Sequence, residues 1–265
     1  MSERSLDRDA LRSAVEENMA HFVRTWNQWH GLELIDDGQI LQTVCPVPYP
    51  LFNNISRARI DDGAPDEAID AILERSHRPL MWWVGPSARP TDLADRLQER
   101  GLMPGGNLPG MARDLKSFED PDGLPEGVSV LRVDDDELLE AWCVVGGVGF
   151  EFPDFATGPF LELFRALGVA PPWHHYVALV EGEPVATASL FEGAGVAGVY
   201  NVSTLPEERR KGYAAAISRF VLTEAKSLGY RYATLQSTPM AVALYEGLGF
   251  ETVCDLEVYV GMPDE

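Results

Sequence analysis

The first half of the chain alternates between helical and extended patterns of apolar residues. Apolar side chains recur at helical spacing over residues 5–29, which predicts a helix there. Residues 32–60 follow a strand-like pattern that prolines interrupt at positions 46, 48 and 50. The further elements predicted in this half are a helix over 66–75, a strand over 79–84, a helix over 91–100 and a strand near 107–114.

The second half begins after residues 116–127, which contain acidic residues, proline and glycine without periodicity. We interpret this stretch as a linker and predict a first domain over 1–115 and a second domain over 128–265. The second domain is expected to contain a strand over 128–133, helices over 135–145 and 158–167, a hairpin of strands over 176–180 and 185–191, a strand over 196–204, a helix over 213–228, a strand over 232–236, a helix from Pro239 to Gly247 with Thr238 as its N-cap, and a strand over 250–260.

The two halves have a similar order of elements, which suggests a degenerate repeat. The strand at 55–60 and the helix at 66–75 would correspond to the strand at 196–204 and the helix at 213–228. Each pair is followed by a strand and then a short helix that ends at a glycine. Chance similarity between two α/β segments would give the same pattern, so both interpretations stay open.

Composition narrows the kind of partner. The formal net charge of −21 disfavours nucleic acid and anionic membrane surfaces, and it would attract a cationic amine. The three cysteines are widely spaced, so neither a disulfide framework nor a zinc site is indicated. Residues 1–9 are charged and lack the apolar core of a secretory signal, and no apolar run reaches the roughly 18 residues of a membrane span. We therefore expect a cytoplasmic protein with reduced thiols.

The most informative segment runs from the predicted strand at 196–204 into the predicted helix at 213–228. Pro206 turns the chain, and three cations follow at Arg209, Arg210 and Lys211. Helix starts carry unpaired N–H groups and positive partial charge, so they bind anions. Gly212 lacks a Cβ and would let a pyrophosphate approach the backbone closely. The alternative is a basic surface turn that begins an ordinary helix.

Two motifs resemble signatures of the GNAT superfamily of N-acyltransferases. Arg209-x-x-Gly212-x-Ala214, preceded by Leu205-Pro206-Glu207, is similar to the pyrophosphate loop of that family. The segment over 241–250 is similar to its second signature, and the resemblance covers about 128–260. It implies an α/β fold with a mixed, twisted sheet whose central strands splay apart. Acetyl-CoA would be the acyl donor, and no metal is implied.

The resemblance also assigns roles to particular residues. The pantetheine arm would pair with the strand edge at Val202 and Thr204, with Ser203 between them. Gln236, at the end of the strand opposite, could touch the same arm or could only pair with the sheet edge. The pyrophosphate would rest on the loop and helix start, where the implied residues are Arg209, Arg210, Lys211, Gly212, Tyr213, Ala214 and Ala215. Tyr245 would donate a proton to the leaving thiolate, unless it is a core tyrosine.

The first domain lacks an equivalent phosphate loop. Residues 60–65 are acidic where a cofactor would need cations, so this half would be a degenerate GNAT-like or helper domain that binds no coenzyme A. If it is GNAT-like, the fold consists of two tandem GNAT-like halves.

The general base and the acceptor are left open. The strand at 198–202 carries no carboxylate, which departs from many relatives of the family. Candidate bases are Glu151, Asp154, His174 and His175, and water is a further alternative.

We expect an acetyl-CoA-dependent N-acetyltransferase that acts on a small-molecule amine. One alternative is a coenzyme A sensor without turnover. Another is an enzyme that uses a longer acyl-CoA, which the apolar loop around Phe150 suggests. The sequence does not determine the oligomeric state, and a homodimer is one alternative.

Overall fold

The computed structural model describes residues 5–60, 63–77, 79–120 and 122–263, and it divides into two compact units. Unit 1 comprises Met1–Gly110, Gln236–Pro239 and Thr252–Glu265, and unit 2 comprises Met111–Leu235 and Met240–Glu251. Neither unit is contiguous in sequence, because the strands at 103–114 and 251–261 each run from one unit into the other. The boundaries at 1–115, 116–127 and 128–265 therefore stay a prediction about folding segments.

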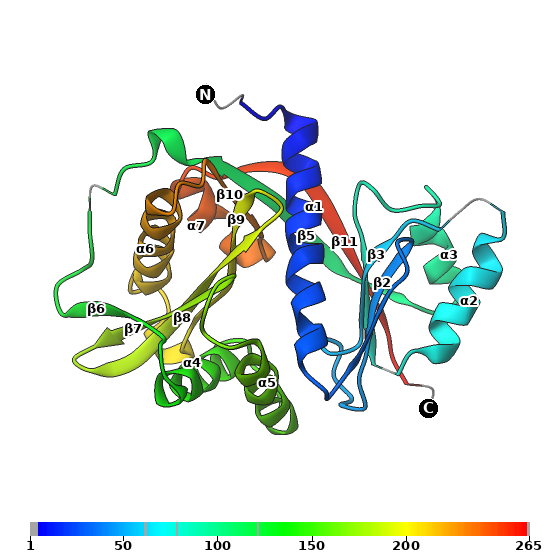
Figure 1. Cartoon of the computed structure of the whole chain (residues 1–265), viewed down its shortest axis with the longest axis horizontal. Helices are drawn as coiled ribbons and strands as arrows, with labels where there is room; N and C mark the ends of the chain where they lie inside the picture. Colours follow the sequence, from blue (N-terminus) through cyan, green and yellow to red (C-terminus); the bar gives the residue numbers. More distant parts are fainter. Residues whose placement is uncertain (1–4, 61–62, 78, 121, 264–265) are drawn as a thin grey trace. The chain divides into compact units, whose positions relative to one another are not determined.

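Unit 1 is an α/β unit whose helices and strands follow the predicted order (Figure 1). Its elements are α1 (Arg8–Arg24), β1 (Glu33–Asp36), β2 (Ile40–Val44), β3 (Asn54–Ala58), α2 (Pro65–Arg75), β4 (Leu80–Val84), α3 (Leu93–Glu99), the first part of β5 (Met103–Asp114) and most of β11 (Glu251–Gly261). The carboxylate of Asp7 accepts the N–H of Ala10 at 2.9 Å, which fixes the start of α1. Strands β3 and β4 are parallel, and β11 is antiparallel to β4.

Unit 2 contains the segment with the candidate phosphate loop. Its elements are β6 (Val128–Arg132), α4 (Asp136–Gly149), α5 (Asp154–Leu167), β7 (Trp173–Val180), β8 (Glu183–Gly193), β9 (Val196–Thr204), α6 (Tyr213–Ser227), β10 (Tyr232–Gln236) and α7 (Val242–Gly247). Its strands lie in the order β10-β9-β8-β7-β6. β9 and β10 are parallel, and β6 to β9 pair antiparallel, so the sheet is mixed as predicted.

Helices cover both faces of the unit 2 sheet. Neighbouring strand residues point to opposite faces. Tyr176 of β7 contacts Phe220 of α6, whereas His175 contacts Trp142 of α4. The α6 face holds a large apolar core that also includes Ile217. This core fixes α6 beneath β9, and so it fixes the loop between them.

Two predicted helix starts in unit 2 are wrong. α5 begins at Asp154 rather than 158, and it contains Pro159 without ending there. The proline removes one backbone hydrogen bond, but the packing of buried residues such as Phe160 and Phe164 maintains the helix. Pro239 begins a 3-10 turn over Pro239–Ala241, so α7 starts later and its N-cap is Ala241 rather than Thr238.

The two units repeat one topology. In each, a strand leads through a helix to a parallel neighbour, as β3–α2–β4 in unit 1 and β9–α6–β10 in unit 2. A short helix and a long strand then follow, α3 with β5 and α7 with β11. The predicted repeat is confirmed in this order of elements. Over the described residues, no helix is long and apolar enough to cross a membrane.

Candidate functional site

The parallel strands β9 and β10 separate after a short paired stretch. Their register joins Ala197 to Ala233 and Gly198 to Thr234, and it extends no further among the described residues. In this register, β10 therefore does not pair with β9 from residue 199 to the end of β9 at Thr204. The predicted splaying of the central strands is confirmed, and Val202, Ser203 and Thr204 all lie in the splayed stretch.

A bulge in β9 reorients this splayed stretch. The pairing with β8 shifts between Thr187 and Ser189, and Asn201 has a φ of +52°. The hydroxyl of Thr187 donates to the Asn201 carbonyl oxygen at 2.8 Å, which holds the bulge in place. Bulges twist a strand and redirect its side chains. Here the bulge comprises Asn201 and Val202, so it includes the first of the residues expected to contact pantetheine.

The loop after β9 ends in an open helix start. Gly212 is the N-cap of α6 with a φ of +90°, and its carbonyl oxygen accepts the N–H of Ala216 at 3.0 Å. No side chain caps this helix, and among the described residues the N–H groups of Tyr213, Ala214 and Ala215 have no acceptor. A Cβ at Gly212 would meet no atom within 4 Å. These features fit a phosphate group.

The three cations of the loop differ in their partners. Lys211 contacts both carboxylate oxygens of Glu208 at 3.0 Å, and this pairing raises the pKa of the lysine. The guanidinium of Arg209 contacts Glu151 and two backbone carbonyl groups. Arg210 is exposed and has a φ of +64°, and no residue that the structure describes pairs with it. The loop therefore offers one unpaired cation, where the sequence suggested three.

Tyr245 lies on α7 with only 7% of its surface exposed. Its ring packs against Phe250 with the ring centroids 5.8 Å apart. Burial raises the pKa of the phenol well above its usual range, so the hydroxyl stays protonated near neutral pH. Within the described chain the hydroxyl has no hydrogen-bond partner. It is thus both a core residue and a neutral O–H group, which leaves both predicted roles open.

Each candidate base is constrained by its surroundings. His175 is fully buried, its Nδ1 lies 2.7 Å from the Ser189 hydroxyl, and burial lowers its pKa to about 3. His174 is also buried, with its Nε2 2.8 Å from Glu192. Both histidines are therefore held within the fold. Glu151 is exposed but paired with Arg209, and Asp154 is exposed at the start of α5.

Gln236 is the last residue of β10 and falls in unit 1. Its side-chain nitrogen is buried without a hydrogen-bond partner among the described residues. Its expected contact with pantetheine stays a prediction.

Comparison with known proteins identifies the domain. Residues 137–250 match the sequence profile of the Acetyltransferase (GNAT) family, and this range contains β9, the loop, α6 and α7. These residues form a GNAT domain. No curated protein matches the sequence.

Solved structures extend this likeness of fold beyond the GNAT domain. A GCN5-related N-acetyltransferase from Kribbella flavida is 21% identical with a TM-score of 0.67, and the match covers 92% of this chain and 96% of that one. A GCN5-related N-acetyltransferase from Sphaerobacter thermophilus is 18% identical (TM-score 0.58, 87% and 84% covered). A tandem GNAT protein from the clavulanic acid biosynthesis pathway is 15% identical (TM-score 0.59, 89% and 85% covered). The chain thus has the GNAT fold in a tandem arrangement.

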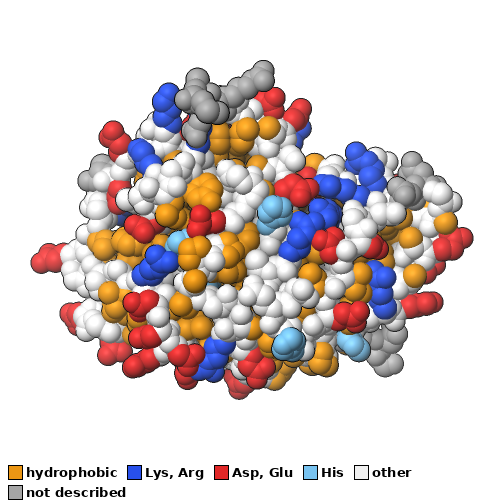
Figure 2. All heavy atoms as spheres, viewed as in Figure 1, with side chains coloured by type: hydrophobic (Ala, Val, Ile, Leu, Met, Phe, Trp, Pro, Cys, Tyr) orange, Lys and Arg blue, Asp and Glu red, His pale blue; other side chains and the backbone are white. Residues whose placement is uncertain are grey.

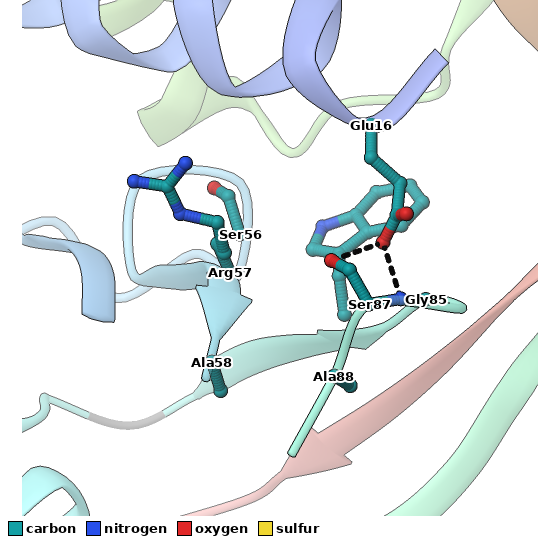
Figure 3. Close-up of a pocket in the computed structure, with 8 residues that line it drawn as sticks. Glu16, Ser56, Arg57, Ala58, Gly85, Ser87 and Ala88 are labelled. Atoms are coloured by element: carbon teal, nitrogen blue, oxygen red, sulfur yellow. Dashed lines mark hydrogen bonds between the residues drawn. The ribbon is translucent and has the colours of Figure 1, made fainter. Parts of the chain in front are cut away.

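The position in unit 1 that corresponds to the splayed strands β9 and β10 is filled. β3 and β4 pair at Asn54–Met81 and Ile55–Trp82 and then separate. Figure 3 shows Glu16 of α1 reaching into this gap, where its carboxylate accepts the N–H and hydroxyl of Ser87 at 3.1 and 2.8 Å. The remaining cavity is about 10 Å³, roughly enough for a single water molecule. It is too small for a cofactor arm.

The sequence does not predict the contacts of two residues beside these separating strand pairs, Glu16 in unit 1 and Gly149 in unit 2. From the sequence, Glu16 is simply a residue of the first predicted helix. Gly149 is simply a residue after the predicted helix at 135–145, and its close approach to Ser203 is seen only in the structure. No local pattern marks either contact. The prediction about the acidic loop at 60–65 rests in part on residues 61 and 62, which lie outside the described residues.

Proposed function

We propose that this protein is an acetyl-CoA-dependent N-acetyltransferase that acts on a small-molecule amine. One observation carries the proposal: the unpaired edge of β9 leads directly into a helix start whose N–H groups are also unpaired. An extended arm with amide groups can pair with the strand edge, and phosphates can bind at the helix start. The match of residues 137–250 to the GNAT family supports this interpretation.

Different residues beside the splayed strands would bind acetyl-CoA and transfer the proton. Backbone groups of Val202 and Thr204 would hold the pantetheine arm, and N–H groups from Arg210 to Ala214 would hold the pyrophosphate. Bound acetyl-CoA supplies the acetyl group as an activated thioester. The Tyr245 hydroxyl would give its proton to the leaving thiolate, although burial raises the pKa of this phenol and so makes it a weaker acid. β9 carries no carboxylate between 198 and 202, so we assign removal of the amine proton to water.

The acidic surface is consistent with an amine acceptor. Figure 2 shows acidic side chains spread over the visible face rather than gathered in one patch. With a net charge of −21, such a surface attracts cations over long range and repels polyanions. We accordingly propose neither a nucleic acid nor a membrane as a partner. A cytoplasmic location and a homodimer are further proposals, which fractionation and ultracentrifugation can test.

Titration calorimetry with acetyl-CoA, followed by turnover of an amine panel, tests the proposal. We expect micromolar binding with one site per chain and release of free thiol with at least one amine. Binding without turnover of any amine would favour the second candidate, a coenzyme A sensor. The absence of a carboxylate on β9 favours that candidate. No binding at all would contradict both.

The variant Tyr245→Phe separates the two candidates. An enzyme that uses the phenol as its acid should lose turnover by about 10²-fold or more while its affinity for acetyl-CoA barely changes. The ring packing against Phe250 is kept in this variant, so the fold should be unaffected. Unchanged turnover would leave Tyr245 as a core residue only.

A further inference from the structure

The side chain of Arg209 joins three parts of unit 2. Its Nε donates to the carbonyl oxygen of Thr204 at 3.4 Å, and its Nη2 donates to that of Gly149 at 2.8 Å. Its Nη1 lies 3.2 Å from the carboxylate of Glu151. All three nitrogens of the guanidinium are thus directed at the protein. They link the end of β9 to the end of α4 and to the loop at 150–153.

The contacts of Arg209 with the two backbone carbonyl groups stabilise this arrangement more than its contact with the Glu151 carboxylate does. Glu151 has 72% of its side chain exposed, and exposed ion pairs contribute little to stability. Gly149 is the last residue of α4, where carbonyl oxygens lack helical partners and carry negative partial charge. A cation that donates to such a group caps the helix end. Arg209 therefore caps α4 from a loop 60 residues further along the chain.

The loop at 150–153 has a conformation that needs support. Glu151 has a φ of +58°, a region that residues with a Cβ seldom adopt. The same loop exposes 39% of Phe150, which stacks on Phe152 with centroids 5.8 Å apart. Gly149 fits so closely against β9 that a Cβ there would lie 1.9 Å from the Ser203 hydroxyl. This contact and Arg209 together fix the loop beside the splayed strand.

We propose that Arg209 is a positioning residue that holds the 150–153 loop against β9, while Arg210 is the cation that contacts the phosphates. The inference rests on the proposed function and deepens it, because it separates the roles of two neighbouring arginines in one motif. Loss of Arg209 loosens the loop and leaves acetyl-CoA affinity nearly unchanged. Loss of Arg210 weakens acetyl-CoA affinity and leaves the loop unchanged.

Calorimetry with acetyl-CoA on Arg209→Ala and Arg210→Ala tests the first half of this separation. We expect Kd to rise by about tenfold in Arg210→Ala, as for loss of one charge-assisted contact, and by less than about twofold in Arg209→Ala. An equal or larger rise in Arg209→Ala would overturn the proposal, because Arg209 would then be the phosphate ligand.

Hydrogen exchange of the unliganded protein tests the second half. The N–H groups of Phe150, Glu151 and Phe152 donate to carbonyl groups of residues 146–148 at 2.9–3.1 Å, so their exchange reports the order of the loop. Arg209→Ala should speed this exchange by about tenfold or more, and Arg209→Lys should do the same because lysine lacks the forked geometry. The amide of Ile217 in α6 serves as the internal control. Unchanged exchange at 150–152 would overturn the proposal.

Calorimetry and hydrogen exchange can contradict the proposed function and the role of Arg209 independently of each other. If the wild-type protein binds no acetyl-CoA, the proposed function falls, and the exchange rates still decide whether Arg209 holds the loop. A double-mutant cycle with Glu151→Gln then measures how much of the effect comes from the carboxylate. We expect Glu151→Gln alone to speed exchange by less than about threefold, since the two carbonyl contacts remain.

Discussion

The two parallel strand pairs of this molecule share a topology and differ at the strand edge. In unit 2, β9 separates from β10 after Gly198, and β10 does not pair with the rest of β9 up to Thr204. In unit 1, β3 separates from β4, but the backbone of Arg89 covers its edge. The N–H of Arg89 donates to the Ala58 carbonyl at 2.9 Å, and its carbonyl accepts the N–H of Ile60 at 3.1 Å. An arm that needs strand pairing finds partners only at β9.

The helix starts after these strands differ as well. α6 has Gly212 as its N-cap and no acidic residue in its first turn. α2 begins with Pro65, which has no N–H to offer, and has Asp66 and Glu67 in its first turn. Negative charge at that position opposes phosphate binding. The same topology thus carries a helix start that suits an anion in unit 2 and one that opposes an anion in unit 1, depending on a few residues.

The largest test of this comparison is Gly212→Glu. The new side chain would occupy open space at the helix start and add negative charge where phosphates are expected, so acetyl-CoA binding should fall by about 10²-fold or more. Gly229 offers a matched control at the other end of α6, because it also has a φ of +90° and open space. Gly229→Glu introduces the same backbone strain and should bind acetyl-CoA normally, as calorimetry would show. Equal loss in both variants would contradict the assigned site.

The sequence predicts the scaffold of the site better than its contacts. β9 and β10 have the predicted bounds, because each is a short apolar run bounded by clear turn signals. The partners of Arg209 and Glu16 could not be predicted, since they lie 60 and 71 residues away in the chain. Such contacts depend on how helices pack on the sheet, and no local pattern records that packing. The sequence therefore predicted where the open helix start lies, but it overcounted the free cations beside it.

Among the histidines, those of unit 2 should contribute most to the acid sensitivity of the fold. The histidines of unit 1, at positions 21, 30 and 77, are exposed, whereas His174 and His175 of unit 2 are buried. Burial lowers the pKa of His175 from 6.5 to about 3. Between these values the unfolded chain binds a proton that the folded chain does not. The free energy of unfolding should therefore decrease as the pH falls from about 6.5 towards 3, by about 1.4 kcal/mol per pH unit.

Urea unfolding of wild type and His175→Gln at a series of pH values measures this contribution. The variant lacks the titrating group. Between pH 6.5 and 3, the slope of its unfolding free energy against pH should therefore be smaller than that of the wild type by about 1.4 kcal/mol per pH unit. Above pH 7 the pH dependence of the two proteins should be the same. Parallel curves below pH 6 would show that His175 takes up its proton in the folded state.

The close approach of α4 to β9 predicts a contrast between two glycines. A Cβ at Gly149 would lie 1.9 Å from the Ser203 hydroxyl and 3.0 Å from the backbone oxygen of Thr204, so Gly149→Ala should destabilise the protein by about 1–3 kcal/mol. The three atoms nearest to a Cβ at Gly85 in unit 1 lie at the ends of the Glu16 and Leu256 side chains rather than in the backbone. Gly85→Ala should therefore cost less in the same thermal unfolding assay.

The smallest effect tests whether unit 1 could ever bind the cofactor. Glu16→Ala removes the acceptor for the N–H and hydroxyl of Ser87, which should lower the unfolding free energy by about 1 kcal/mol. Glu16→Gln keeps one acceptor oxygen and should recover most of that loss. Neither variant should add a second acetyl-CoA site, because Arg89 still covers the edge of β3 and α2 still begins with Pro65 and two acids. A calorimetric stoichiometry of two in Glu16→Ala would show that the glutamate alone closes this cleft.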